Sequence, residues 1–319
     1  MATGQVPRRV RYVRPFFLVL FLFSACTNVQ PTVTIGVLAP FEGLHRRSGY
    51  LALAAVRAAI ADYPAPGAGV LPLALDDGNT PATALRSAQK LRVDPRVAAV
   101  VGPLNPALAP AVGETLTAAH ILWQRPYAPA VDPTTASAGA DEWAIGLVRA
   151  AARGVIQEGA SSLVVAGWTP GWPALTPALW SAAAGIPVRL DDSPATVQND
   201  EAVFWMGSPE GAADYLAALR QRQLSAPFWM GPQGDDPIFV ERAASFDRVF
   251  WAIWTDAGYN NWVEQHATPS PTAYLVYKAA VAAVQSATNQ RANAPQQPWF
   301  VQAYAVNADG TSGRYIIEP

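Results

Sequence analysis

The 319-residue chain contains 51% hydrophobic and 14% charged residues and has a net charge of −2. This balance excludes a basic nucleic-acid-binding face, and the about 290 residues beyond the N-terminal segment suffice for a large core divided into two domains. Cys26 is the single cysteine, which excludes an internal disulfide.

Residues 1–25 are predicted to be a secretory signal. Four arginines precede an apolar run at residues 16–23, and small residues lie just before Cys26. The run is too short to span a bilayer. The segment resembles a bacterial lipobox, with Phe23 in place of the usual leucine, so Cys26 is expected to be lipidated and residues 26–31 to form the lipidated tether. A plain secretory signal is the alternative. Removing residues 1–25 leaves 18 basic and 24 acidic residues, a charge of −6.

Short apolar runs alternate with segments of helical spacing in the first half of the chain. Strands are predicted at residues 33–39, 71–75, 97–101 and 121–123, and helices at residues 49–63, 81–94 and 107–119. Thr80 and Asn105 each precede a proline, as an N-cap residue precedes proline at the first helical position. The alternation is typical of βαβ units, which form a parallel sheet.

The loops after these strands are the predicted ligand-binding loops. The carboxyl ends of parallel strands share one edge of the sheet, where open α/β sheets bind ligands. The candidate ligand-binding residues in these loops are Phe41, Glu42, Leu104, Asn105, Arg125, Tyr127 and Ala128. Asp76 and Asp77 admit a metal or acid/base site, but adjacent acids after a strand usually form turns and caps, and no metal site is predicted.

The second half of the chain repeats the alternation. Asp141 is predicted to cap a helix over residues 142–159, and Gly185 to end a helix over residues 172–185. Strands are expected at residues 162–166, 202–206, 228–230 and 249–254, further helices at 209–223 and 271–288, a connector at 289–298, and a C-terminal hairpin at 300–306 and 314–317.

Patterns of enzymatic chemistry are absent from the sequence. His45, His120 and His266 are far apart, with no HExxH or clustered Cys/His spacing. There is no G-x-S-x-G nucleophile elbow and no P-loop. We therefore predict a protein that is not an enzyme and uses no cofactor.

Six segments, in chain order, carry a family resemblance: IGVLAPFEG, LALDDGNTPATALRSAQKL, VAAVVGPLNPALAPAV, ILWQRPYAPAVDP, VFWMGSPEGAADYLAALRQRQLSAPFWMGPQG and PSPTAYLVYKAAVAAVQSA. The chain resembles the type 1 periplasmic binding proteins of the leucine/isoleucine/valine-binding class. The resemblance implies two Rossmann-like α/β lobes with parallel sheets, joined by three crossovers. Lobe 1 would comprise residues 32–134 and 256–297, and lobe 2 residues 135–255 and 298–319. It also implies closure over a small ligand that is delivered to an ABC permease in the membrane.

The ligand contacts of the amino-acid-binding relatives are only partly matched. Where relatives have hydroxyl groups, this chain has Leu104-Asn105-Pro106-Ala107 and Tyr127-Ala128-Pro129, and Gln233 stands where an acidic residue is expected. Burying an ammonium group without a carboxylate is costly, which argues against a standard α-amino acid. Asn105 and Gln233 favour a neutral, hydrogen-bonding ligand. Arg125 either holds an anion or forms a solvated or interlobe ion pair.

Trp168, Trp172 and Ser208 complete the predicted site. Trp172 matches the position where relatives cover the ligand with an aromatic ring, and indole suits amide, aromatic or cyclic ligands. A cage for a quaternary amine is an alternative. We predict an extracytoplasmic solute-binding lipoprotein, anchored to the cell membrane by its lipid and without a nucleic-acid partner. The alternative is a non-transport envelope lipoprotein or sensor module. Such a protein would have a degenerate ligand cleft and would act through protein contacts.

Overall fold

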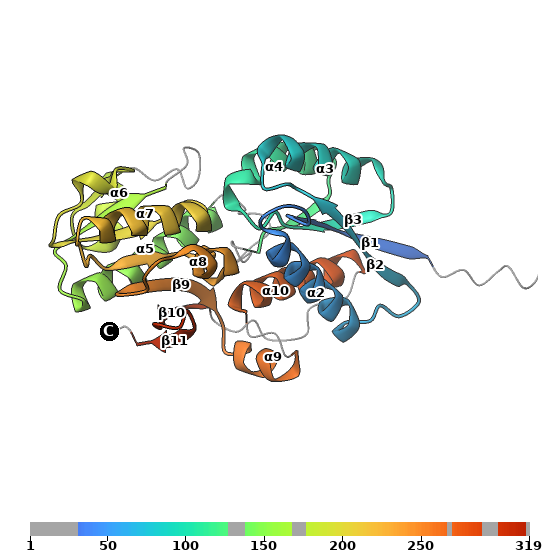
Figure 1. Cartoon of the computed structure of the whole chain (residues 1–319). Coiled ribbons are helices and arrows are strands. Elements are labelled where there is room, and N and C mark those ends of the chain that lie inside the picture. The colour runs from blue at the N-terminus through green and yellow to red at the C-terminus, as the bar shows by residue number, and fades with distance from the viewer. Residues whose placement is uncertain (1–30, 127–137, 168–176, 267–269, 289–298, 317–319) are drawn as a thin grey trace, which may run out of the picture.

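The computed structural model describes residues 31–126, 138–167, 177–266, 270–288 and 299–316. These residues form two lobes, each built around one sheet with helices on its faces (Figure 1). The α/β class and the two lobes predicted from the sequence are therefore confirmed.

The first sheet has four parallel strands in the order β2-β1-β3-β4. They are β1 (Thr32–Ala39), β2 (Gly69–Asp76), β3 (Val97–Val101) and β4 (Leu122–Gln124). Ile35 and Val37 of β1 face one helical layer and Leu38 faces the other. Both faces are thus covered, which explains the continuous apolar runs in β1 and β3.

Four helices cover this first sheet. They are α2 (Arg46–Asp62) and α10 (Pro271–Ala287) on one face, and α3 (Pro81–Val93) and α4 (Ala109–Ala118) on the other. A short 3-10 turn, η1 (Pro106–Leu108), precedes α4. Figure 1 shows α10, near the red end of the colour range, lying beside the blue α2, so a late part of the chain completes the first lobe.

The second sheet has seven strands in the order β11-β10-β9-β8-β7-β5-β6. They are β5 (Ser162–Ala166), β6 (Val188–Leu190), β7 (Glu201–Trp205), β8 (Phe228–Met230), β9 (Val249–Thr255), β10 (Phe300–Val306) and β11 (Ser312–Tyr315). The strands β5 to β9 are parallel, whereas β10 is antiparallel to β9 and to β11. The C-terminal hairpin therefore returns to the second lobe, as predicted.

The remaining elements surround this sheet or join the lobes. They are α5 (Ala138–Gln157), α6 (Pro177–Ala184), η2 (Pro194–Thr196), α7 (Pro209–Gln221), η3 (Pro232–Asp235), α8 (Pro237–Arg242) and α9 (Tyr259–Gln265). Helix α5 packs closely on the sheet at Gly154, where a Cβ atom would lie 2.1 Å from the Trp229 ring. Only glycine allows that approach.

The second crossover, which follows β9, is fixed by polar contacts. The buried carboxylate of Asp256 accepts a hydrogen bond from the Tyr274 hydroxyl and lies 2.9 Å from Lys278 Nζ. Both partners are on α10, so the segment leaving the second sheet is tied to the first lobe. Residues 127–137 and 289–298 lie outside the described residues, so the predicted limits of the lobes stay a prediction.

Several local predictions differ from the structure. Asp141 does not cap a helix, because α5 already begins at Ala138 and includes Asp141. Asn105 caps the 3-10 turn η1 before α4 begins. The strand β6 and the helices α8 and α9 were not predicted, since each is short. No described helix is both long and apolar enough to cross a bilayer.

Candidate functional site

A cavity lies between the lobes at the carboxyl ends of the two sheets. Its volume is about 160 Å³. One water requires about 10–15 Å³, so the cavity has room for a small molecule. Its apolar wall includes Leu51, Leu104, Val276, Leu147, Phe204 and Trp205. Polar side chains from both lobes interrupt this wall, which is the usual composition of a small-molecule site.

Four helical segments begin at this cavity, each with a cap residue followed by proline. Asn105 Oδ1 accepts from the Ala107 amide at 3.0 Å and Ser208 Oγ from the Gly211 amide at 3.2 Å. Asp236 and Ser270 cap α8 and α10 in the same way. A capping side chain offers its oxygen to the first turn of its own helix, and proline presets the backbone. The caps therefore hold these polar groups in fixed positions at the cavity wall.

Two amide side chains in the cavity are oriented by hydrogen bonds. Asn105 Nδ2 donates to Asn79 Oδ1 at 2.8 Å, and Gln233 Nε2 donates to the Trp205 carbonyl at 2.7 Å. Trp205 Nε1 in turn donates to the Ser208 carbonyl at 2.9 Å. Fixed amides of this kind select ligands by the direction of their hydrogen bonds.

Asp235 joins the lobes at the floor of the cavity. Its carboxylate accepts from Ser270 Oγ at 2.6 Å and from the Thr272 amide at 3.1 Å, both at the start of α10. Burial raises the pKa of Asp235 to about 6, and no arginine or lysine among the described residues offsets that effect. The second lobe therefore presents two carboxylates, Asp235 and Asp236, to the cavity close to Gln233.

His45 lies at the rim of the cavity between two carboxylates of the second lobe. Its Nε2 is 3.5 Å from Glu210 Oε2 and its Nδ1 is 3.6 Å from Asp236 Oδ2. Ser48, one turn further along α2, donates to Asp236 Oδ2 at 2.8 Å. Together with the Asp235 contacts, this makes direct polar bonds between the lobes on two sides of the cavity.

Comparisons with known proteins agree with this two-lobed geometry. Residues 32–184 match a family described as periplasmic binding protein. The chain has the fold of the type 1 periplasmic binding proteins. A comparison with curated protein sequences gives no match.

Solved structures of periplasmic binding proteins share the fold. A leucine-binding protein from Thermotoga maritima is 15% identical, with a TM-score of 0.69 over 90% of this chain and 99% of its own. A branched-chain amino acid transporter substrate-binding protein from Streptococcus pneumoniae, in complex with isoleucine, is 16% identical, with a TM-score of 0.67 over 90% and 100%. A solute-binding protein from R. palustris, in complex with benzoate, is 14% identical, with a TM-score of 0.64 over 89% and 95%. At these identities the likeness shows the fold.

The predicted site residues fall into three groups. Leu104, Asn105, Ser208 and Gln233 line the cavity. Phe41 and Glu42 do not line it: their amides donate to the Asp76 carboxylate, at 2.8 and 3.2 Å. Arg125 lies outside the lining as well, with its guanidinium 5.2 Å from the Trp123 ring. Tyr127, Ala128, Trp168, Trp172 and Cys26 lie outside the described residues.

Seven polar cavity residues were not among the predicted ligand contacts: His45, Ser48, Asn79, Asp235, Asp236, Ser270 and Thr272. Two of them had a readable signal, because Asp236-Pro237 and Ser270-Pro271 repeat the cap–proline pair of Asn105-Pro106. His45 had none, because its partners come from the opposite lobe. Asp77 forms a turn, as predicted, by accepting from the Asn79 amide at 2.9 Å. No group of metal ligands occurs among the described residues.

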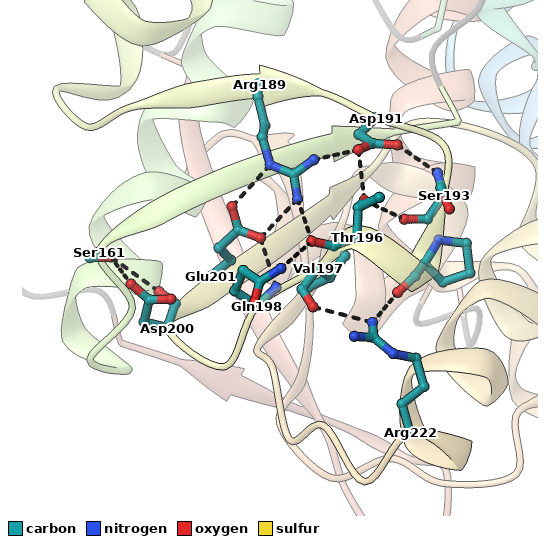
Figure 2. A network of polar contacts seen from close by, with 11 residues as sticks. Ser161, Arg189, Asp191, Ser193, Thr196, Val197, Gln198, Asp200, Glu201 and Arg222 are labelled. Atoms are coloured by element: carbon teal, nitrogen blue, oxygen red, sulfur yellow. Dashed lines mark hydrogen bonds and ion pairs between the residues drawn. The ribbon is translucent and has the colours of Figure 1, made fainter.

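A second polar network lies away from the cavity, at the β6 edge of the second lobe. Figure 2 shows the Arg189 guanidinium between Glu201 and Asp191, beside the η2 turn. Arg189 donates to both Glu201 oxygens, at 2.9 and 2.8 Å. Its contact holds the pKa of Glu201 below the ordinary value, while hydrogen bonds from Thr196 and Ser193 chiefly lower that of Asp191. This network ties β6 to β7 and has a structural role.

Proposed function

We propose that this protein is the extracytoplasmic, lipid-anchored solute-binding component of an ABC importer. It binds a small amino-acid-like, amide or aromatic ligand by closure of the two lobes. The observation that carries the proposal is the interlobe cavity, whose apolar wall holds fixed polar groups from both lobes.

The chemistry of the cavity supports a ligand with an apolar body and a polar end. Leu51, Leu147 and Phe204 can bury the body, while Asn105 and Gln233 offer amide hydrogen bonds. Asp235 adds an acceptor that can pair with an amine. Isoleucine and benzoate, which are bound in two proteins of the same fold, each combine an apolar body with a polar end.

A ligand screen tests the proposal. Amino acids, amides, short peptides, urea-like compounds and aromatic acids are added singly, and the melting temperature and tryptophan fluorescence are recorded. A ligand that binds the closed form alone stabilises it by mass action, by about 2.7 kcal/mol at a concentration of 100 Kd. Trp205 lines the cavity, so its emission is expected to report binding.

Gln233→Leu is the matching variant. It removes the amide from the cavity, and the affinity of a ligand that bonds it should fall about fivefold, since a hydrogen bond contributes about 1 kcal/mol. Gln221→Leu, at an exposed position of α7, is the control and should leave the affinity unchanged. If no compound shifts the melting temperature, the transport proposal loses its support, and recovery of an envelope protein by pull-down would favour the sensor alternative.

The lipid anchor is tested separately. Cys26→Ser should release the protein from the membrane fraction, because thioether lipidation requires the thiol. Retention of the variant in that fraction would contradict lipidation and favour a plain secretory signal.

A further inference from the structure

His45 is held in place by the fold of the first lobe. Its carbonyl accepts from the amides of Ser48 and Gly49 at 3.0 and 3.3 Å, so it starts the first turn of α2. Gly49 lies against the loop after β1, where a Cβ atom would be 2.1 Å from the Pro40 carbonyl oxygen. The close approach fixes the start of α2, and with it the buried imidazole, at the rim of the cavity.

The ring nitrogens of His45 face carboxylates on two different elements of the second lobe. Glu210 is in the first turn of α7 and Asp236 caps α8. A neutral imidazole carries one N–H and can satisfy only one of them, whereas the imidazolium donates from both nitrogens. The geometry therefore fits the charged ring.

The remaining charged groups around His45 have clear positions. Asp77, in the loop after β2, is buried and contributes a favourable charge from the first lobe. Asp235 lies next to Asp236 in the chain. On α2, the helix that begins after His45, Arg47 pairs with Glu241 of α8. The start of α2 itself disfavours a cation, because the helix dipole is positive there. The two second-lobe carboxylates therefore supply most of what stabilises a proton on His45, and they supply it only when the lobes are closed.

We propose that His45 is a proton-dependent latch, which takes up a proton as the lobes close and holds the second lobe through Glu210 and Asp236. This regulation rests on the proposed function, because it acts at the rim of the same ligand cavity. The protein should close more readily, and retain its ligand longer, at acidic pH than at alkaline pH.

The direction of the pKa shifts agrees with this latch. The pKa of His45 is raised above its ordinary 6.5, first by its contact with Asp236 and despite the opposing effect of burial. A raised histidine pKa stabilises the closed form below pH 6.5, and this stabilisation is lost as the pH rises through the raised value. Burial also raises the pKa of Asp235, which contacts α10 of the other lobe, to about 6, so ionisation of this acid opposes the same conformation at higher pH.

Spin labels on the two lobes test the latch in the protein without added ligand. Lys90→Cys and Asp214→Cys, both at exposed helical positions, carry the labels in a Cys26→Ser background. The interlobe distance distribution is measured at pH 5.5 and pH 8.5. We expect the closed fraction to fall several-fold between these values, and His45→Asn to abolish this pH response.

His120→Asn is the matched control, since His120 is exposed and lies outside the cavity lining. It should retain the pH response, while Glu210→Gln should reduce it. The latch is refuted if the distance distribution is independent of pH, or if His45→Asn responds like the unsubstituted protein. A compound that closes the lobes equally at both pH values would also refute the latch and leave the solute-binding proposal intact. If the interlobe distance depends on pH but no compound in the screen binds, the latch is supported and the solute-binding proposal is not.

Discussion

The two polar networks of this molecule shift the pKa values of their carboxylates in opposite directions. In the network at the β6 edge, Glu201 is paired with Arg189 and has a lowered pKa (Figure 2). In the cavity, Asp235 accepts from the Ser270 hydroxyl and the Thr272 amide and has a raised pKa. The first network is electrostatically complete within one lobe, whereas the second becomes complete only with a proton or a ligand cation. Perturbed acids without a charge partner are typical of functional sites.

The largest expected effect is in the β6 network. Arg189→Met leaves Glu201 buried without its partner and should lower the free energy of unfolding by about 2–3 kcal/mol, less than for a fully buried pair because the guanidinium is partly exposed. Urea unfolding at pH 7 measures this loss. Arg96→Met, which removes an exposed ion pair with Asp94, is the control and should change little. Equal losses in the two variants would contradict the structural role of Arg189.

The pH dependence of the Arg189→Met effect adds a second check. Because the pKa values of Glu201 and Asp191 are lowered, their stabilising contribution is present above the ordinary values of 4.5 and 3.8 and is lost as the pH falls through the lowered ones. The difference between the variant and the unsubstituted protein should therefore shrink in acid.

The cavity should show the reverse behaviour. Asp235→Asn keeps an acceptor for Ser270 and Thr272 but removes the buried charge, so it should stabilise the protein at pH 8, by on the order of 1–2 kcal/mol. This gain should decline as the pH falls from about 6, where Asp235 takes up a proton, towards its ordinary value of 3.8. Thermal melts across this range measure it. With Asp214→Asn as the exposed control, a gain that does not vary with pH would rule out the buried charge as its cause.

The smallest effect separates capping from ligand contact. Ser208→Ala and Thr80→Ala each remove a side-chain cap and should each cost about 0.5–1 kcal/mol of stability. Only Ser208 lines the cavity, so only Ser208→Ala should also weaken a ligand found in the screen. Titration calorimetry compares the two variants, and equal weakening by Thr80→Ala would show that the loss acts through the fold alone.

Much of the fold could be read from local patterns. The strand at residues 97–101 was predicted at its observed limits, because a β-branched run is bounded there by a turn and by Gly102. Thr80 and Ser208 cap helices as their position before proline indicates. By contrast, β6 has only three residues and carries Arg189 in its centre. Its pairing with β5 and the ion pair to Glu201 make it a strand, and neither is visible in its own sequence.

The candidate site likewise has residues that could be predicted from the sequence and residues that depend on tertiary contacts. Asn105 was predicted because it follows a strand at the ligand-binding edge, a relation that the order of elements determines, and Gln233 because it stands where the relatives have an acidic residue. Local spacing and capping thus let the sequence by itself determine the longer elements, their order and the parallel pairing of the strands that alternate with helices. The polar contacts across the cavity were decided only by the tertiary structure. Ser48 and Asp236, which form one of these contacts, are 188 residues apart in the chain. Electrostatic partners depend on distance in space, and the packing of α2 and α8 at the closed rim is what brings His45 between Glu210 and Asp236.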